Sequence, residues 1–147
     1  MRGMPWTCRP LAALLLVLLL AAAACSSIPT PKMKRYKWPK DAYIGEPERP
    51  YEKLGLVRTR IEYPSLDPSR EEGALCKNYF NKAAGDLVTR ARKVGGDAVI
   101  DVRSAVFLFD GRAETYPSPE CSDDGQEGQV LAQGIAVKWR KPGDPRV

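Results

Sequence analysis

The sequence predicts an α+β domain in the order β-α-β-β-β, in which one helix packs on a mostly antiparallel sheet and a disulfide pins the fold. Three observations lead to this expectation. Apolar and polar residues alternate over 51–63, apolar residues recur at helical spacing over 75–94, and the pair Asp110-Gly111 separates two strand-like stretches. At 147 residues the chain has room for one small domain with tails.

The first predicted strand runs from Tyr51 to Tyr63. The segment 64–68 breaks it, and Asp67-Pro68, or Ser69 together with Glu72, supplies the start signal of a helix. One face of the strand carries Val57, Thr59, Ile61 and Tyr63, and the other carries Arg58, Arg60 and Glu62.

The predicted helix ends at Gly95-Gly96, because glycine is the residue best suited to the left-handed turn that terminates a helix. Gly85 interrupts the pattern, so we expect a kink or a close contact with the sheet there. The apolar stripe consists of Leu75, Tyr79, Ala83, Leu87, Ala91 and Val94.

Three strands are expected after the helix. The first spans 97–110, with a bend or bulge near Ser104, and the turn at Asp110-Gly111 joins it to 112–116. Residues 117–128 form a loop by composition, and 129–140 form the last strand. The strand over 97–110 places Ala98, Ile100, Val102 and Val106 on one side; the last strand places Leu131, Ile135, Val137 and Trp139 on one face and Ala132, Gly134 and Ala136 on the other.

The first 24 residues have the pattern of a signal peptide, with a basic start and a long apolar run. The uncharged run from Leu11 to Cys25 covers 15 residues, fewer than the roughly 20 that a membrane-spanning helix needs. Small residues, Ala22-Ala23-Ala24, lead into Cys25, and this junction resembles the lipobox of bacterial lipoproteins. The resemblance implies cleavage before Cys25 and lipid on its thiol; the alternative is an ordinary secretory signal that leaves Cys25 a plain thiol.

Export leaves two cysteines in the mature domain. By resemblance to Gram-negative sorting rules, Ser26 after Cys25 implies an outer-membrane address that faces the periplasm. Cys76 and Cys121 are then an even pair in an oxidising compartment, which predicts a disulfide between the start of the helix and the acidic loop. The alternative is two independent buried thiols.

Residues 25–50 are expected to form a lipidated, proline-rich tether, and 141–147 a flexible tail. The tether holds few aliphatic residues, so it cannot offset its ordering entropy by burial. At about 3.1 Å per residue it would reach roughly 75 Å. Its cations could lie on an anionic membrane surface or along an acidic partner, or the segment could be a merely soluble linker. They are Lys32, Lys34, Arg35, Lys37 and Lys40.

Catalytic and cofactor chemistry is not expected. The chain has no histidine, which excludes Ser-His-Asp and Cys-His pairs and imidazole metal ligands. The loop 121–127 lacks the ligand spacing of a calcium-binding EF-hand. Ser104, Ser118 and Ser122 have no base at a supporting spacing, so a hydrolase that works without histidine is the least favoured function. The mature chain is only mildly basic, which argues against nucleic-acid binding.

Four segments carry a resemblance to a known group: residues 54–57, 82–88, 95–100 and 133–137. They are similar to the YbjQ-like fold and its lipoprotein relatives, which include the RcsF family of outer-membrane stress sensors. The resemblance implies a non-catalytic binding or stress-sensing module in the bacterial envelope, with an outer-membrane or periplasmic protein as partner. A structural envelope protein that contacts peptidoglycan or an outer-membrane protein is the alternative.

Overall fold

A computed structural model describes residues 33–64, 71–108 and 110–141. The chain divides into two compact units, Met1–Lys34 and Arg35–Val147, and the fold described below belongs to the second. The predicted signal peptide, Cys25, Lys32 and the C-terminal residues 142–147 lie outside the described residues. Among the described residues, no helix has the length and apolar character required to cross a membrane.

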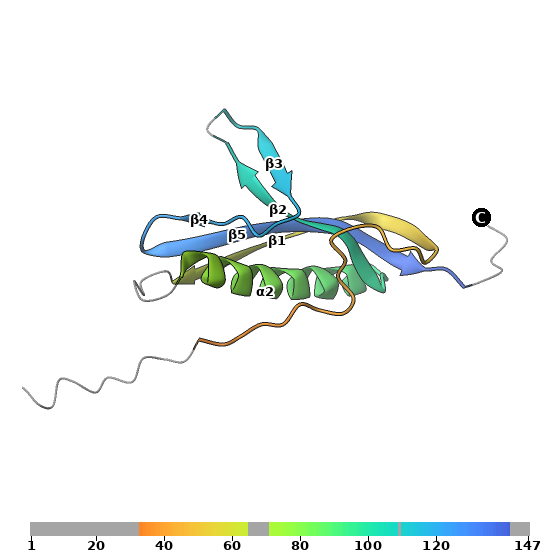
Figure 1. The fold of residues 1–147 in the computed structure, drawn as a ribbon. Coiled ribbons are helices and arrows are strands. Elements are labelled where there is room, and N and C mark those ends of the chain that lie inside the picture. Colours follow the sequence, from red (N-terminus) through yellow and green to blue (C-terminus); the bar gives the residue numbers. More distant parts are fainter. Residues whose placement is uncertain (1–32, 65–70, 109, 142–147) are drawn as a thin grey trace, which may run out of the picture. The chain divides into compact units, whose positions relative to one another are not determined.

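The second unit is one helix packed on a mostly antiparallel sheet (Figure 1). The strand order is β1-β5-β2-β3, and the short β4 pairs with β5 beyond this path. This confirms the predicted α+β class and its antiparallel sheet; the sequence missed β4 inside the expected loop. The strands are β1 (Tyr51–Pro64), β2 (Ala98–Phe107), β3 (Ala113–Tyr116), β4 (Ser122–Asp123) and β5 (Glu127–Trp139).

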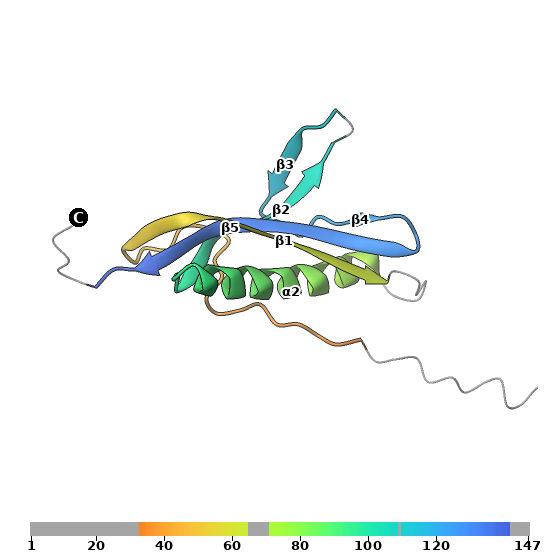
Figure 2. The same ribbon diagram turned by 180° about the vertical axis from the view of Figure 1, so that it is seen from behind.

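Helix α2 (Glu72–Lys93) covers one face of the sheet, as both views show (Figures 1 and 2). Glu71 occupies the N-cap position and makes no side-chain capping bond. The expected caps, Asp67 and Ser69, lie outside the described residues. The end at Gly95 is confirmed: its φ is +85°, the left-handed conformation that favours glycine. The buried helix residues are Leu75, Cys76, Asn78, Phe80, Ala83, Ala84, Leu87, Val88 and Ala91.

Side chains of the neighbouring strands fill the space above two glycines of β5. Val99 fills the space above Gly134, where a Cβ would overlap its Cγ1 atom, and the ring of Tyr63 fills the space above Gly128 in the same way. Tyr63 stacks on Tyr79 with ring centroids 4.3 Å apart. Burial raises the pKa of the Tyr63 phenol, whose buried hydroxyl has no hydrogen-bond partner within the described residues.

A bulge in β2 changes which residues face the helix. The register shifts between Ile100 and Arg103, and Asp101 has a φ of +51°. The extra residue places Val102 in the main core and Ile100 in a second cluster on the other sheet face. The expectation that these residues share one side is therefore wrong, whereas a bulge is present in this strand, a few residues before Ser104.

The second cluster lies on the face of the sheet away from the helix, near the end of β5. Tyr43 and Tyr51 pack edge-on against Trp139, with ring centroids 5.9 and 6.4 Å away. The guanidinium carbon of Arg49 lies 4.8 Å from the centre of the Trp139 ring. The buried members of the cluster are Ala98, Ile100 and Val137.

Residues 35–50, here called the strap, belong to the folded unit. The folded part thus begins before residue 51, where the sequence predicts that the tether ends and the domain begins. Backbone pairing holds the strap at the edge of β2: Val99 donates to Asp41, Tyr43 donates to Val99, and Val102 donates to Tyr43, each at 2.9 Å. The strap and β3 therefore pair with different lengths of the same β2 edge.

Candidate functional site

The cations expected to bind a surface are only partly placed by the structure. Cys25 and Lys32 lie outside the described residues, and Lys34 is exposed at the end of the first unit. Arg35, Lys37 and Lys40 are exposed along the strap. The structure thus fixes three of these cations on the folded unit rather than on a free arm.

Two aromatic residues dock the strap beside α2. Oδ1 of Asn78 accepts a hydrogen bond from the backbone N–H of Tyr36 at 2.8 Å, and the side-chain amide of Asn81 donates to the Tyr36 carbonyl at 2.9 Å. The Trp38 ring packs against Phe80 with centroids 5.6 Å apart. Its indole N–H donates to the carbonyl of Ala42 at 2.8 Å.

The expected disulfide between Cys76 and Cys121 is confirmed, with Cα atoms 5.8 Å apart. It joins the first turns of α2 to the segment that leads into β4. The hydroxyl of Ser104 holds the same segment, because it donates to the carbonyl of Ser118 at 2.7 Å and accepts from the N–H of Glu120 at 3.2 Å. Ser104 is buried, so its hydroxyl serves the packing of this segment.

The sheet face away from the helix, here called the outer face, is open over β1 and β5. The hairpin of β2 and β3 stands off this face (Figures 1 and 2). Beneath it lies an apolar recess of about 120 Å³, and among the described residues that line it, Arg58 carries the one charge. Phe107 and Leu56 on this face are 68% and 53% exposed. The recess is lined by Arg58, Thr59, Ala105, Phe107, Ala113, Leu131, Ala132 and Gln133.

The turn of this hairpin is held by its own side chains. Arg112 donates to both carboxylate oxygens of Asp110, from its backbone N–H at 3.0 Å and from Nε at 2.6 Å. These bonds lower the pKa of the Asp110 carboxyl. Gly111 has a φ of +81°, which confirms the expected turn at Asp110-Gly111.

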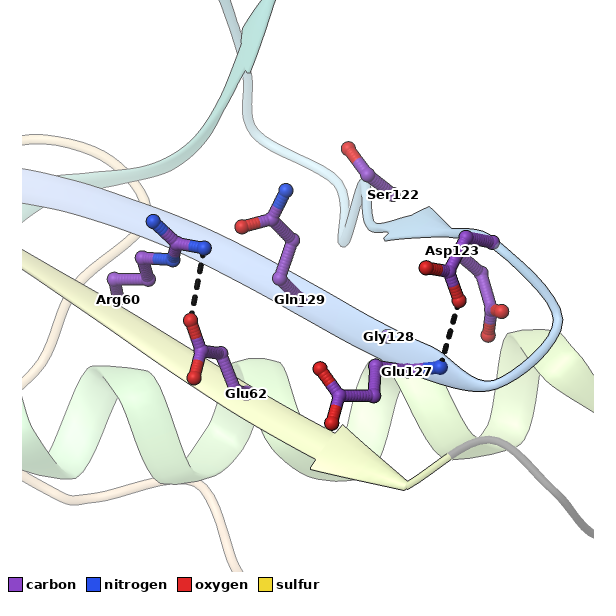
Figure 3. A pocket seen from close by; sticks show the side chains of 8 residues that line it. Arg60, Glu62, Ser122, Asp123, Glu127, Gly128 and Gln129 are labelled. Atoms are coloured by element: carbon purple, nitrogen blue, oxygen red, sulfur yellow. Dashed lines mark hydrogen bonds and ion pairs between the residues drawn. The ribbon is translucent and has the colours of Figure 1, made fainter.

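A polar recess of about 240 Å³ lies further along the outer face, between β1 and the loop that joins β4 to β5 (Figure 3). On the β1 side, Arg60 and Glu62 form an ion pair at 2.8 Å. On the loop side, Oδ1 of Asp124 accepts hydrogen bonds from the backbone N–H groups of Gln126 at 2.9 Å and Glu127 at 2.8 Å. These bonds, the one from Glu127 first, lower the pKa of the Asp124 carboxyl.

The carboxylates of this loop are engaged by its own backbone. Oδ1 of Asp123 accepts from the N–H of Gly125 at 2.7 Å, in the same manner as Asp124. Within residues 33–64, 71–108 and 110–141, no cluster of three or more Cys, Asp or Glu side chains could hold a metal ion.

The sequence analysis did not predict that the outer face is a candidate binding surface. The alternation over 51–63 predicts Arg58 and Arg60 only as the polar side of a half-buried strand. Phe107 and Leu131 converge because the register sets Ala105 opposite Leu131, while Arg58 lies opposite Gln133 and donates to it at 3.2 Å. The one signal in the sequence was Phe107, which departs from the alternation of its strand.

Comparison with known proteins places the chain in no family. No family model matches it, and no curated protein matches it. Among solved structures, it is similar to a protein of unknown function of the DUF74 family from Pediococcus pentosaceus. That similarity has a TM-score of 0.46 at 13% sequence identity and covers 67% of this chain and 96% of the other, and we draw no functional conclusion from it.

Proposed function

We propose that this chain is a non-catalytic lipoprotein of the bacterial envelope, whose outer face binds a protein partner in a sensing or adaptor role. The observation that carries the proposal is the pair of exposed apolar side chains, Leu56 and Phe107, on a sheet face that no element covers fully. Apolar residues gathered beside a positive charge are typical of protein-binding surfaces. The export signal and the lipobox-like junction before Cys25 supply the envelope address.

Lipid attachment is tested first. The wild-type protein should incorporate radiolabelled palmitate, and Cys25→Ser should lose the label. A matched Cys76→Ser/Cys121→Ser variant should keep it, since those thiols are joined to each other. A soluble, unlabelled wild-type protein would contradict the anchoring and the outer-membrane address together.

The binding face is tested by photocrosslinking in cells. A benzoylphenylalanine at position 107 should capture a protein in a discrete adduct, whereas the same probe at Thr89, exposed on the helix side, should not. Changing Leu56 to Ser and Arg58 to Gln should abolish the adduct, because Arg58 lines the recess with Phe107 and Leu56 lies two residues before Arg58 on the same face of β1. Equal adducts from positions 107 and 89 would contradict the proposed face, and adducts with peptidoglycan fragments would favour a structural role.

A further inference from the structure

Cations gather where the strap runs beside the helix, and all of them are exposed except Lys82, which is half-buried. On α2, Lys82 and Lys93 are nearly in line, because positions eleven apart differ by only about 20° at 3.6 residues per turn, and Arg90 lies about 80° round the helix from Lys82. The Lys82 ammonium lies 6.0 Å from the centre of the Tyr36 ring, which joins these residues to the strap. We call this surface the strap–helix face: Arg35, Lys37, Lys40, Lys82, Arg90 and Lys93.

Few carboxylates offset these charges. Asp41 of the strap is paired with Arg92 at 2.8 Å. Among the described helix residues, the acids on this side are Asp86, four positions after Lys82, and Glu72 at the start of α2. Acidic residues gather instead on the hairpin, in β4 and on the loop that joins β4 to β5, which both views draw on the side of the sheet away from α2 (Figures 1 and 2). Those acids are Glu114, Asp123, Asp124 and Glu127.

The chain outside the described residues leads into this same surface. Nine residues, 26–34, separate Cys25 from Arg35. At about 3.1–3.5 Å per residue they span roughly 30 Å at most, less than half the reach expected when residues 25–50 were taken as a free tether. An anchor on Cys25 therefore holds the start of the strap close to the membrane; this step rests on the lipid attachment proposed above.

We propose that the strap–helix face docks on the anionic headgroups of the membrane that holds the anchor, so that the outer face points away from the bilayer. Each cation near an anionic surface strengthens binding about five-fold at physiological salt. The docking is thus expected to weaken as salt rises, since the attraction between exposed charges is screened.

The test uses the processed protein, purified from a bacterial host and mixed with vesicles of phosphatidylcholine, with or without phosphatidylglycerol. A water-soluble reagent acylates exposed lysines, and mass spectrometry measures the rate at each one. On anionic vesicles Lys82 and Lys93 should react at least five-fold more slowly than on neutral vesicles. Lys53, which lies on β1 beside Tyr51, should react equally on both.

Two charge-matched variants assign the effect. Arg90→Gln/Lys93→Gln should return Lys82 to its rate on neutral vesicles, while Arg58→Gln/Arg60→Gln, on the outer face, should leave the protection of Lys82 intact. Both pairs are exposed and remove the same charge. Equal loss in the two variants would overturn the proposal, because attraction would then follow net charge rather than this face.

The remaining outcomes separate docking from anchoring. Protein that floats with both kinds of vesicle but reacts equally at Lys82 and Lys93 overturns docking and leaves the anchor standing. Protein that fails to float with neutral vesicles contradicts the anchor, and protection on anionic vesicles then still supports the face. Protection seen in cells but absent on vesicles would overturn membrane docking and assign the surface to an acidic protein.

Discussion

The backbone N–H of Tyr36 donates to Oδ1 of Asn78 at 2.8 Å, a bond that joins two residues 42 positions apart in the sequence. Together with Trp38 on Phe80, it fastens the strap beside α2. A segment whose composition indicates a free tether is therefore part of the folded unit.

Replacing Trp38 by alanine should lower the free energy of unfolding by about 2 kcal/mol, less than the roughly 3–5 kcal/mol typical of a fully buried tryptophan. The indole is half-buried against Phe80 and donates to the Ala42 carbonyl. Urea denaturation measures the change. The neighbouring exposed Lys37→Ala should change it by less than about 0.5 kcal/mol. A Trp38→Ala protein as stable as wild type would mean that the strap adds nothing to the fold.

The sequence predicted the elements in which buried residues recur at a regular spacing, every second residue in a strand or every three to four residues in a helix. In β1, Val57, Thr59 and Ile61 are buried in alternation, and α2 buries most of its expected stripe at helical spacing, so both could be recognised. Val94, expected at the end of that stripe, is 58% exposed. The strap could not be recognised in this way. It is held by backbone bonds to β2 and by two aromatic rings, and it has no repeating apolar face. Deletion of residues 33–40 would therefore remove packing as well as charge, because Tyr36 and Trp38 contact α2.

The candidate surfaces were harder to predict than the fold. The disulfide followed from counting cysteines, whereas the recess near Arg58 depends on which residues of β1, β5 and β2 lie in register. Arg58 of β1 is paired with Gln133 of β5, and Leu131 of β5 is paired with Ala105 of β2, although these strands are distant in sequence. The bulge at Asp101 also moves the residues that follow it to the opposite face of the sheet from the one that simple alternation predicts.

Gly134→Ala should destabilise the protein by about 1–3 kcal/mol, the usual range for an overpacked core. The added Cβ would overlap Cγ1 of Val99 and lie 3.1 Å from the carbonyl oxygen of Ile100. Gly85→Ala is the matched control, since its Cβ would meet nothing within 4 Å. That change should stabilise the helix by up to about 1 kcal/mol, because alanine is the better helix former. Thermal unfolding compares the two, and equal effects would show that the fit at Gly134 is loose.

Loss of the disulfide should cost about 4 kcal/mol on the chain-entropy model. The bond joins residues 45 apart, so the unfolded chain gains the freedom of that loop when it is removed. Cys121→Ser and the double variant Cys76→Ser/Cys121→Ser should be destabilised alike, as measured by urea denaturation without reductant. An unchanged midpoint in Cys121→Ser would indicate that packing alone holds this segment.

The Asp124 carboxyl should titrate below about 3.9, the value of a free aspartate. Its pKa is lowered because the N–H groups of Glu127 and Gln126 donate to the charged form. The turn is therefore fully held above the free pKa, and its hydrogen bonds weaken as the pH falls through the lowered value. NMR should show the side-chain carbon of Asp124 and the amides of Gln126 and Glu127 shifting with one midpoint.

Two variants decide whether that midpoint belongs to Asp124. Asp124→Asn should remove the shared low-pH step from both amides, because the asparagine oxygen accepts the bonds without titrating. Glu120→Gln should leave the step in place, since the Glu120 carboxylate makes its hydrogen bond to the hydroxyl of Ser118 rather than to the turn. A midpoint at or above about 3.9 would mean that the two backbone bonds do not persist in solution. The turn would then be held by the paired backbone of β4 and β5 alone.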